Sequence, residues 1–543
     1  MGHEESFGEA FSFQCSWHEA FTNGAFLTTF SGEILKSYIV KKRWYAGKSS
    51  TLKYIEIIDH FKIESEEALH YGVLLEVNFN EAFFQNYFIP ITFIDRENPD
   101  TNTIIAPVRF NDSEGFLIDA LHKEMFRRLL FEKILTSKND EHFKIKYHKG
   151  KKLDGVTYST SRFMGVEQSN TSIIYNDAFV LKFFRRIYNN TNPDYEINRF
   201  LTERQKFNHT PTYAGSINLS YASEENITLA LMQQLVPNQG DAWSYMLTIL
   251  DKIFTTLQQK NDTTEKLPEI KLFQKQKVES LPEEILTWTG LEIFYRVQKL
   301  AQRTAEMHIA LGSDIHDTAF TPTTYNSDYT VWLKNRLLYQ FQNRLNTIEN
   351  NLDRLSGLAL TRAHEFLDRK KEIRKRFLDF NWTKLKGERI RIHGDYHLGQ
   401  VLVNDDDFYI LDFEGEPEST IRDRKVKQPP LKDVAGMFRS FHYAIYATIF
   451  GNEEKYQYPR EELFNAGEIL YRYLTGIFLE TYIEKAQAGN LNIGYTHEIA
   501  FLLKYCMLEK AVYELGYELN SRPSWAIIPL EGIRSIMNYN ENI

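Results

Sequence analysis

Cysteine is nearly absent from this chain. Cys15 and Cys506 are the two cysteines among 543 residues, and they lie far apart in the sequence. Two such residues form neither a disulfide framework nor a cysteine-rich zinc site. So little cysteine is typical of a reducing compartment, and we expect a cytoplasmic protein.

Long apolar runs and an excess of positive charge are missing as well. No stretch approaches the roughly 20 apolar residues of a membrane-spanning helix, and the start of the chain lacks a basic segment followed by an apolar core. The formal net charge of −9 leaves no electrostatic footprint for nucleic acid. We therefore expect a soluble globular protein that binds neither membranes nor nucleic acid.

The pattern of apolar residues changes along the chain and predicts an α+β protein. Residues 52–110 contain four β-like runs separated by turn-prone segments, whereas residues 117–135 have helical spacing. Beyond Asn238 the chain becomes mostly helical. These changes predict a β-rich subdomain over 1–112, a second mixed subdomain over 113–236 and a largely helical part over 237–543.

One stretch carries most of the chemical information. Asp395 follows His393-Gly394, Gln400 follows Asp395 by five positions, and Asp412 opens the turn Asp412-Phe413-Glu414 after a β-like run. A D-x-x-x-x-N loop followed by a D-F-G turn is the protein-kinase arrangement. We therefore predict that Asp395 is the catalytic base and that Gln400, Asp412 and Glu414 are Mg²⁺ ligands.

The groups that would bind ATP are expected earlier, in a hairpin. The polar turn before the hairpin lies where a phosphate-covering loop belongs, although it lacks the glycines of G-x-G-x-x-G. Lys182 on the return strand would hold the phosphates and pair with Glu196 on the next helix, and the strand ending near Val236 would receive adenine. The further residues predicted to bind the nucleotide are Gln168, Ser169, Asn170, Thr171, Ser172, Gln233 and Leu235.

Several strings resemble one family of kinases. The catalytic loop HGDxHxGQ with LDFEGEP is similar to the aminoglycoside-phosphotransferase-like kinases, and Gln400 with Glu414 resembles the maltokinases among them. Residues 43–48 (RWYAGK) resemble the signature of the maltokinase N-terminal cap, and residues 303–308 and 432–440 resemble two further maltokinase strings. The resemblance implies a bilobal kinase-like fold with a cap over 1–112, an N lobe over 113–236 and a C lobe over 237–543.

The resemblance also implies an acceptor site. Residues 510–525 resemble the maltokinase signature KAxYExxYExxxRPxW, whose region lines the sugar site, and aromatic rings and charged groups suit a disaccharide. On the helix predicted there, Leu508, Val512, Leu515 and Leu519 share one arc and should face the core. The residues predicted to contact the sugar are His393, Arg439, Lys510, Tyr513, Glu514 and Tyr517.

If the resemblance holds, the reaction is transfer of the ATP γ-phosphoryl group to the anomeric hydroxyl of maltose, giving maltose 1-phosphate for α-glucan synthesis. Trehalose synthase, a frequent neighbour in the family, is the implied partner. Two alternatives stay open: a kinase for another sugar, aminosugar or aminoglycoside, and a non-catalytic ligand-sensing relative. A protein kinase is disfavoured because HGD replaces HRD and no A-P-E segment follows Asp412.

Overall fold

The computed structural model describes residues 9–64, 68–95, 99–137, 144–165, 169–220, 226–260, 270–378, 382–452, 454–456 and 459–538. The chain divides into two compact units. Unit 1 comprises Met1–Arg199 and Pro211–Val236, and unit 2 comprises Phe200–Thr210 and Pro237–Ile543. None of the described helices has the length and hydropathy that crossing a membrane requires.

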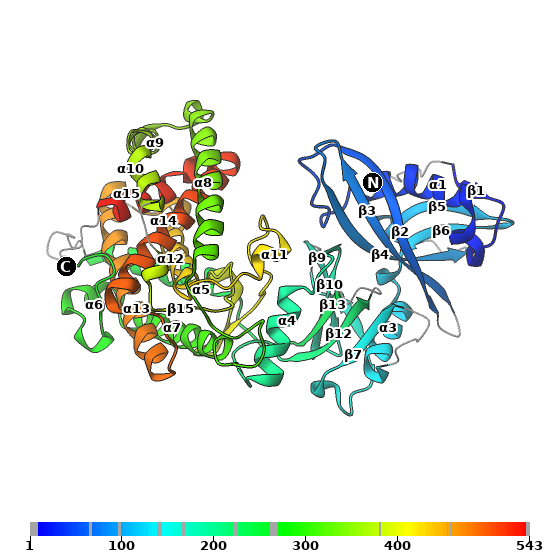
Figure 1. Cartoon of the computed structure of the whole chain (residues 1–543), viewed down its shortest axis with the longest axis horizontal. Coiled ribbons are helices and arrows are strands. Elements are labelled where there is room, and N and C mark those ends of the chain that lie inside the picture. The colour runs from blue at the N-terminus through cyan, green and yellow to red at the C-terminus, as the bar shows by residue number, and fades with distance from the viewer. Residues whose placement is uncertain are drawn as a thin grey trace. The chain divides into compact units, whose positions relative to one another are not determined.

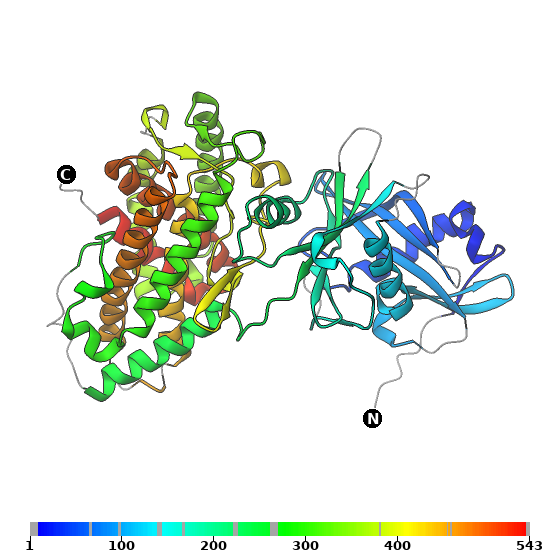
Figure 2. The same cartoon turned by 90° about the horizontal axis from the view of Figure 1, so that it is seen from below.

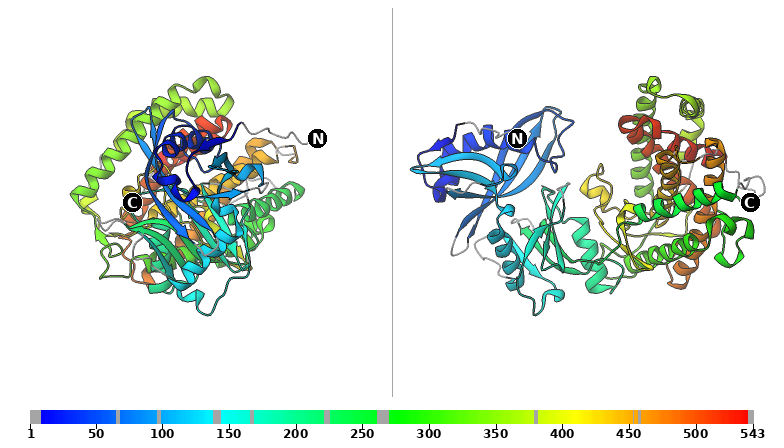
Figure 3. Two further views of the ribbon diagram at one scale, coloured as in Figure 1. Left: turned by 90° about the vertical axis from the view of Figure 1, so that its right-hand side faces the viewer. Right: turned by 180° about the vertical axis from the view of Figure 1, so that it is seen from behind.

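Unit 1 begins with a large curled sheet, the cap sheet. Among the described residues its strand order is β1-β5-β6-β4-β3-β2, and a short strand, β11, pairs with β4 outside this path. The N-terminal helices lie against one face of the cap sheet (Figure 3). The bounds are β1 (Phe11–Phe13), α1 (Gly24–Thr29), α2 (Leu35–Ile39), β2 (Leu52–Glu64), β3 (Leu69–Phe79), β4 (Phe84–Asp95), β5 (Ile104–Phe110), β6 (Ser113–Asp119) and β11 (Arg186–Ile187).

The predicted helix over 117–135 is partly wrong. Leu117 and Ile118 belong to strand β6, where pairing with β4 and β5 buries them, and the helix begins only at Glu124. The remaining residues do form a helix, and Phe126, Leu130 and Ile134 lie on its buried face. Tertiary pairing therefore overrode the local pattern at the start of this segment.

A second sheet of unit 1 carries the predicted hairpin. Its order is β7-β12-β13-β10-β9-β8, and β9 and β10 form the expected antiparallel hairpin. Figure 1 labels these strands, apart from β8, together with α3 and α4. The bounds are α3 (Glu124–Thr136), β7 (Ile145–Lys149), β8 (Ser161–Phe163), β9 (Asn170–Tyr175), β10 (Phe179–Phe184), α4 (Pro193–Arg199), β12 (Tyr213–Ser220) and β13 (Asn226–Gln234).

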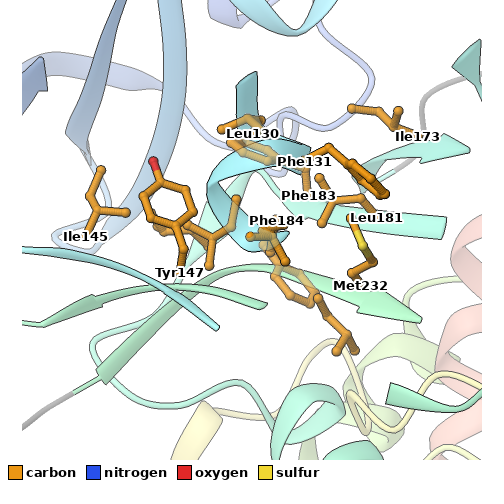
Figure 4. Packing of buried hydrophobic residues seen from close by; sticks show 14 of the residues in the cluster. Leu130, Phe131, Ile145, Tyr147, Ile173, Leu181, Phe183, Phe184 and Met232 are labelled. Carbon is orange, nitrogen blue, oxygen red and sulfur yellow. The ribbon is translucent and has the colours of Figure 1, made fainter. Parts of the chain in front are cut away.

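The two sheets of unit 1 share one apolar core. Leu130 and Phe131 of α3 pack with Leu181, Phe183 and Met232 of the second sheet (Figure 4). The same cluster includes side chains of β2, β3 and β4 from the cap sheet, namely Phe61, Ile63, Leu74 and Phe88. Burial of this shared apolar surface holds the cap sheet against the hairpin.

Unit 2 is mostly helical, as predicted. Helix α14 packs against α8, α12 and α15, while α7 runs along α13 (Figure 2). The bounds are α5 (Ala242–Lys260), α6 (Glu283–Thr289), α7 (Glu292–Leu311), α8 (Ser327–Glu349), α9 (Gly357–Asp368), α10 (Lys370–Leu378), α11 (Ile421–Arg424), α12 (Leu431–Gly451), α13 (Arg460–Ala488), α14 (Thr496–Ser521) and α15 (Ile527–Asn538). The described part of unit 2 also contains two pairs of short strands, β14 (Thr323–Thr324) with β15 (Glu388–Arg389) and β16 (Val401–Asn404) with β17 (Asp407–Ile410).

Candidate active site

The loop that bears Asp395 is held by a buried carboxylate. Asp433, in the first turn of α12, accepts hydrogen bonds from the backbone N–H groups of His393 (2.7 Å) and Gly394 (2.9 Å). His308 of α7 approaches the same carboxylate, with Nε2 3.0 Å from Oδ2. Burial alone would raise the pKa of Asp433, but the hydrogen bond from His308 and the neighbouring charges outweigh it and lower the pKa. Asp433 therefore stays ionised and fixes the loop backbone.

Helix α12 can approach the loop closely because residue 436 is glycine. A Cβ atom at Gly436 would lie 2.6 Å from the carbonyl oxygen of Tyr396. Tyr396 is itself buried, and its hydroxyl lies 2.8 Å from that of Thr304. Residues 432–440, which include Asp433 and Gly436, therefore hold the loop that bears Asp395 against α12.

His393 and His308 are both structural. His308 is fully buried, and its Nδ1 lies 2.8 Å from the Tyr482 hydroxyl. The predicted sugar contact through His393 is not compatible with its surroundings, because its side chain is 1% exposed and its Nε2 lies 2.8 Å from the carbonyl oxygen of Leu411. His393 instead links the catalytic loop to the segment that leads into Asp412.

Asp395 faces the ammonium group of a lysine from α14. Lys510 Nζ lies 3.2 Å from Asp395 Oδ1 and 3.9 Å from Glu416 Oε1. Burial alone would lower the pKa of Lys510, but Asp395, Glu416 and Glu514 outweigh it and raise the pKa above its ordinary value. Lys510 is therefore a permanent cation beside the predicted catalytic base.

A small pocket opens beside this ion pair. Most of its lining residues have polar side chains, and they come from the Asp395 loop, the segment after Asp412, α8, α12 and α14. The residues that contribute are Gln340, Gly394, Tyr396, Glu416, Lys432, Asp433, Gly436, Glu509, Lys510 and Tyr513. The lining includes two aromatic rings, those of Tyr396 and Tyr513, and the cavity volume of about 10 Å³ is that of one water molecule, so the pocket can accept a single polar group such as a sugar hydroxyl.

Two of the three carboxylates that line the pocket, those of Glu416 and Glu509, are paired with cations. Arg336 of α8 lies 2.5 Å from Glu416, and Lys432 lies 3.2 Å from Glu509. Burial alone would raise the pKa of Glu416, but Lys432, Lys510 and Arg336 outweigh it and hold the pKa at about 2. Glu416 is therefore ionised at neutral pH although it is 8% exposed.

The lowered pKa of Glu416 predicts how acid destabilises the fold. Its folded pKa of about 2 lies below the roughly 4.3 of an unfolded Glu, so its contribution is complete above about pH 4.3 and is lost as pH falls towards 2. We expect Glu416→Gln to lower the free energy of unfolding by about 3 kcal/mol at pH 7, and the deficit to shrink near pH 2. Denaturant unfolding at several pH values measures the difference, and Glu418→Gln, at a side chain 61% exposed, is the matched control. A deficit that stays constant down to pH 2 would contradict the assignment.

Gln400 and Asp412 lie together at the β16–β17 hairpin. Gln400 directly precedes β16, Asp412 follows β17 by two residues, and Gln400 Nε2 donates to Asp412 Oδ2 over 2.9 Å. Asp412 has φ +63°, a left-handed conformation that is uncommon outside glycine and often marks a functional position. Amide and carboxylate oxygens are the ligands that Mg²⁺ prefers, so these two residues and the nearby Glu414 fit a Mg²⁺ site chemically.

Arg439 does not line the pocket. It is 1% exposed, and its guanidinium donates to Glu514 Oε2 over 2.8 Å and contacts His442 Nδ1 at the same distance. Burial of Arg439 leaves no surface for the predicted sugar contact, and its ion pair with Glu514 joins α12 to α14, whereas Glu514 keeps a side-chain exposure of 13% and its sugar contact stays a prediction.

The predicted division of α14 into two faces is confirmed. Leu508, Val512, Leu515 and Leu519 are each 3% exposed or less. On the other side Tyr513 lies with its ring 5.3 Å from Lys510 Nζ, whereas Tyr517 is 53% exposed and lies near Arg522. Lys510 and Tyr513 reach the pocket, and Tyr517 is not among its lining residues.

In unit 1, Lys182 has the predicted orientation. Its neighbours Leu181 and Phe183 are buried at 0% and 1%, and its own side chain is 18% exposed. Asp194, two residues before the predicted Glu196, places its Oδ2 3.0 Å from Lys182 Nζ. Asn192 caps α4 by accepting from the Asp194 N–H (2.8 Å) and thereby fixes Asp194 in the first turn. Glu196 is only partly buried, on the same helix.

The polar segment before Lys182 is only partly described. Gln168 lies outside the described residues, Ser169 is exposed, and Asn170 and Ser172 are partly buried at the start of β9. Thr171 is fully buried and accepts a hydrogen bond from Arg185, so it faces away from any ligand. The Leu235 N–H donates to Ala178 O over 2.8 Å and Gln233 pairs with Val180, so these two residues extend the pairing of β13, and the adenine contact at the end of this strand stays a prediction.

Comparison with known proteins identifies the cap and the fold. Residues 38–122 match the maltokinase N-terminal cap domain. The glucosamine kinase of Streptacidiphilus jiangxiensis is 26% identical over 143 residues, which are 26% of this chain and 30% of that kinase. The matched segment thus spans less than a third of the relative's length.

The likeness of folds extends over nearly the whole chain. A structure of glucosamine kinase in complex with glucosamine, ADP and inorganic phosphate has a TM-score of 0.59 and 15% identity, covering 92% of this chain and 98% of that one. A glucosamine kinase in crystal form A gives the same TM-score at 14% identity, over 93% and 99% of the two chains. Residues 38–122 thus resemble the maltokinase N-terminal cap domain, and the chain shares the kinase-like fold of glucosamine kinase, which confirms the fold class predicted from the sequence.

Proposed function

We propose that this protein is an ATP-dependent sugar kinase that transfers the γ-phosphoryl group to the anomeric hydroxyl of maltose and releases maltose 1-phosphate. The observation that carries the proposal is the Asp395–Lys510 ion pair at the edge of a polar pocket, on a loop of kinase pattern. The cap domain match and the sugar kinases that share the fold support it. From the family resemblance we further propose that the protein acts in α-glucan synthesis in the cytoplasm and associates with trehalose synthase.

Within the proposal each residue has a role. Asp395 orients the acceptor hydroxyl and takes its proton, while Lys510 holds the Asp395 carboxylate in place and donates to a sugar hydroxyl. Lys182, fixed by Asp194, contacts the phosphates together with Ser169, Asn170 and Ser172. Gln400, Asp412 and Glu414 would hold Mg²⁺, which supplies positive charge against the phosphate oxygens when bound.

One observation supports a second class of acceptor, the aminosugars. Glu416 and Glu509 line the pocket, and two carboxylates suit an ammonium substituent such as that of glucosamine, the ligand in the related structure. Against it, both carboxylates already have cationic partners, Glu416 in Arg336 and Lys510 and Glu509 in Lys432. Because neither is left to bind an ammonium group, we propose a neutral sugar.

A product assay tests the proposed function. Purified protein is incubated with Mg²⁺, ATP and a panel of maltose, glucose, trehalose, glucosamine and an aminoglycoside, and phosphorylated products are identified by mass spectrometry and NMR. The proposal requires maltose 1-phosphate to form with the highest kcat/KM. Preferential phosphorylation of glucosamine would establish the second acceptor class, and no transfer to any acceptor despite ATP binding would favour a ligand-sensing protein.

The acceptor role of α14 makes a prediction of its own. We expect Tyr513→Ala to raise the KM for maltose roughly five- to thirtyfold, because losing a stacked ring costs about 1 to 2 kcal/mol, and to leave the KM for ATP within twofold. Tyr517→Ala should have a smaller effect, since that ring lies outside the pocket lining. Steady-state kinetics with each substrate varied in turn measure both constants.

Leu515→Ala is the matched control on the same helix. Leu515 is fully buried, so its truncation should lower the melting temperature through a cavity and leave the maltose KM unchanged in the folded fraction. Should Tyr513→Ala behave like Leu515→Ala, the tyrosine belongs to the core and the acceptor site lies elsewhere.

A further inference from the structure

Arg185 is a completely buried cation at the junction between the cap sheet and the hairpin of unit 1. Its side chain has no exposed surface, and it directly follows β10, the strand that bears Lys182. A buried guanidinium is stable only if charged and polar partners replace its water. The partners of Arg185 come from the cap on one side and from β9 on the other.

The cap contributes the counterion and an aromatic ring. Asp119, at the end of β6, places Oδ2 2.6 Å from Arg185 Nη2, and this carboxylate is itself 1% exposed. The Trp44 ring centre lies 5.4 Å from the guanidinium, which explains why the RWYAGK string buries its tryptophan. Both residues lie within the range 38–122 that matches the cap domain.

The backbone around Arg185 is tied to the cap as well. The Phe88 N–H of β4 donates to the Arg185 carbonyl oxygen over 2.9 Å. The next two residues form β11, in which Arg186 pairs with Tyr87 and Ile187 with Asn86 of β4. The chain thus passes from the hairpin strand directly into the cap sheet, with Arg185 at the crossing point.

On its other side Arg185 holds the start of β9. Its Nε donates to Thr171 Oγ1 over 2.8 Å, and Thr171 is fully buried. Thr171 stands between Asn170 and Ser172, the two β9 residues proposed to contact phosphate, and Ser172 pairs in register with Lys182. One guanidinium therefore connects Asp119 and Trp44 of the cap with the strand end that carries these polar side chains.

We propose that Arg185 is a positioning residue through which the cap fixes the phosphate-binding end of β9 and thereby sets the affinity for nucleotide. The proposal rests on the proposed function for the identity of the ligand, but the connection itself is a property of the fold. Asp119 and Trp44 restrain the guanidinium, its Nε–H restrains the Thr171 hydroxyl, and the strand end is held before nucleotide arrives. Preorganisation of this kind lowers the ordering cost of binding.

The test removes the link and leaves the buried ion pair intact. Thr171→Val keeps the side-chain shape and deletes the acceptor of the Arg185 hydrogen bond, whereas Thr171→Ser retains a hydroxyl and is the matched control. Arg185→Lys keeps a charge for Asp119 but lacks the planar fork that also reaches Thr171. The measurements are the Kd of Mg-ATP, the KM for sugar, the melting temperature and amide hydrogen exchange at residues 170–172 without nucleotide.

We expect Thr171→Val and Arg185→Lys each to raise the Kd of Mg-ATP about tenfold and to speed exchange at residues 170–172, with the sugar KM within twofold of wild type and Thr171→Ser close to wild type. The double variant should be no worse than the single variants, because both remove the same contact. Unchanged exchange in Thr171→Val, or equal losses for ATP and sugar, would overturn the proposal. If the wild-type protein binds no ATP, the proposed function fails, and hydrogen exchange alone still decides whether Arg185 positions β9.

Discussion

Replacing Asp395 by Asn should lower kcat by roughly two to four orders of magnitude and leave ATP binding near the wild-type value. Proton removal by a positioned base contributes about 10²- to 10⁴-fold, and the loose transition state of phosphoryl transfer favours the lower part of this range. Asn fills the same space and can still contact Lys510, so the loop keeps its anchors at Asp433. Single-turnover kinetics and a separate ATP titration measure the two quantities.

The matched control for Asp395→Asn is Asp406→Asn. Asp406 lies in the same part of the chain, in the exposed turn between β16 and β17. The control should keep wild-type turnover, because its charge is in water and bears no relation to the pocket. Turnover near the wild-type rate in Asp395→Asn would remove the base from this position.

A contact is easiest to predict from the sequence when its residues lie close together in the chain. Asp395, Gln400 and Asp412 lie within 18 residues, and the hairpin between Gln400 and Asp412 folds locally, so spacing alone predicts the contact of these last two residues. Lys510 was predicted from a family string. Its 3.2 Å contact with Asp395 depends on the packing of α14, which no local pattern encodes.

The residues that sequence reasoning missed act across long distances. Asp433 looks like an ordinary acid in a helix first turn, where it would favour its own helix N-terminus. Only the close packing of α12 at Gly436 turns it toward the loop 40 residues earlier. The contact of Asp194 with Lys182 is likewise absent from the sequence prediction, because it depends on the residue at which α4 begins.

Burial explains the site assignments that had to be corrected. His393, Arg439 and Thr171 are polar residues within functional strings, which made them candidates for ligand contact. Each is 1% exposed or less and is engaged by the protein itself. A polar residue near a site thus has two uses, ligand contact and positioning, and only its exposure distinguishes them.

Asp412→Ala should abolish the gain in nucleotide affinity that Mg²⁺ provides. Asp412 supplies one of the two carboxylates of the proposed ligand set, and Mg²⁺ binds few protein groups in near-octahedral geometry, so removing this charge should leave Gln400 and Glu414 insufficient. Wild-type protein should bind ATP more tightly with Mg²⁺ than with a chelator present. We expect at least a tenfold gain in the wild type and less than a twofold gain in the variant, measured by calorimetric titration under both conditions.

Two comparisons separate loss of a ligand from loss of structure. Residue 412 has φ +63°, so Ala adds backbone strain, whereas Asn tolerates this conformation and keeps one oxygen. Asp412→Asn should therefore melt like the wild type and retain part of the Mg²⁺ gain, and Gln400→Asn should also retain part of it, because the amide oxygen survives on a shorter side chain. The affinity measured with chelator should be the same in all variants, since it depends on groups other than the metal ligands. If Mg²⁺ raised the ATP affinity of Asp412→Ala as much as that of the wild type, the ion would be held elsewhere. The hydrogen bond from Gln400 would then be the reason for the left-handed conformation of Asp412.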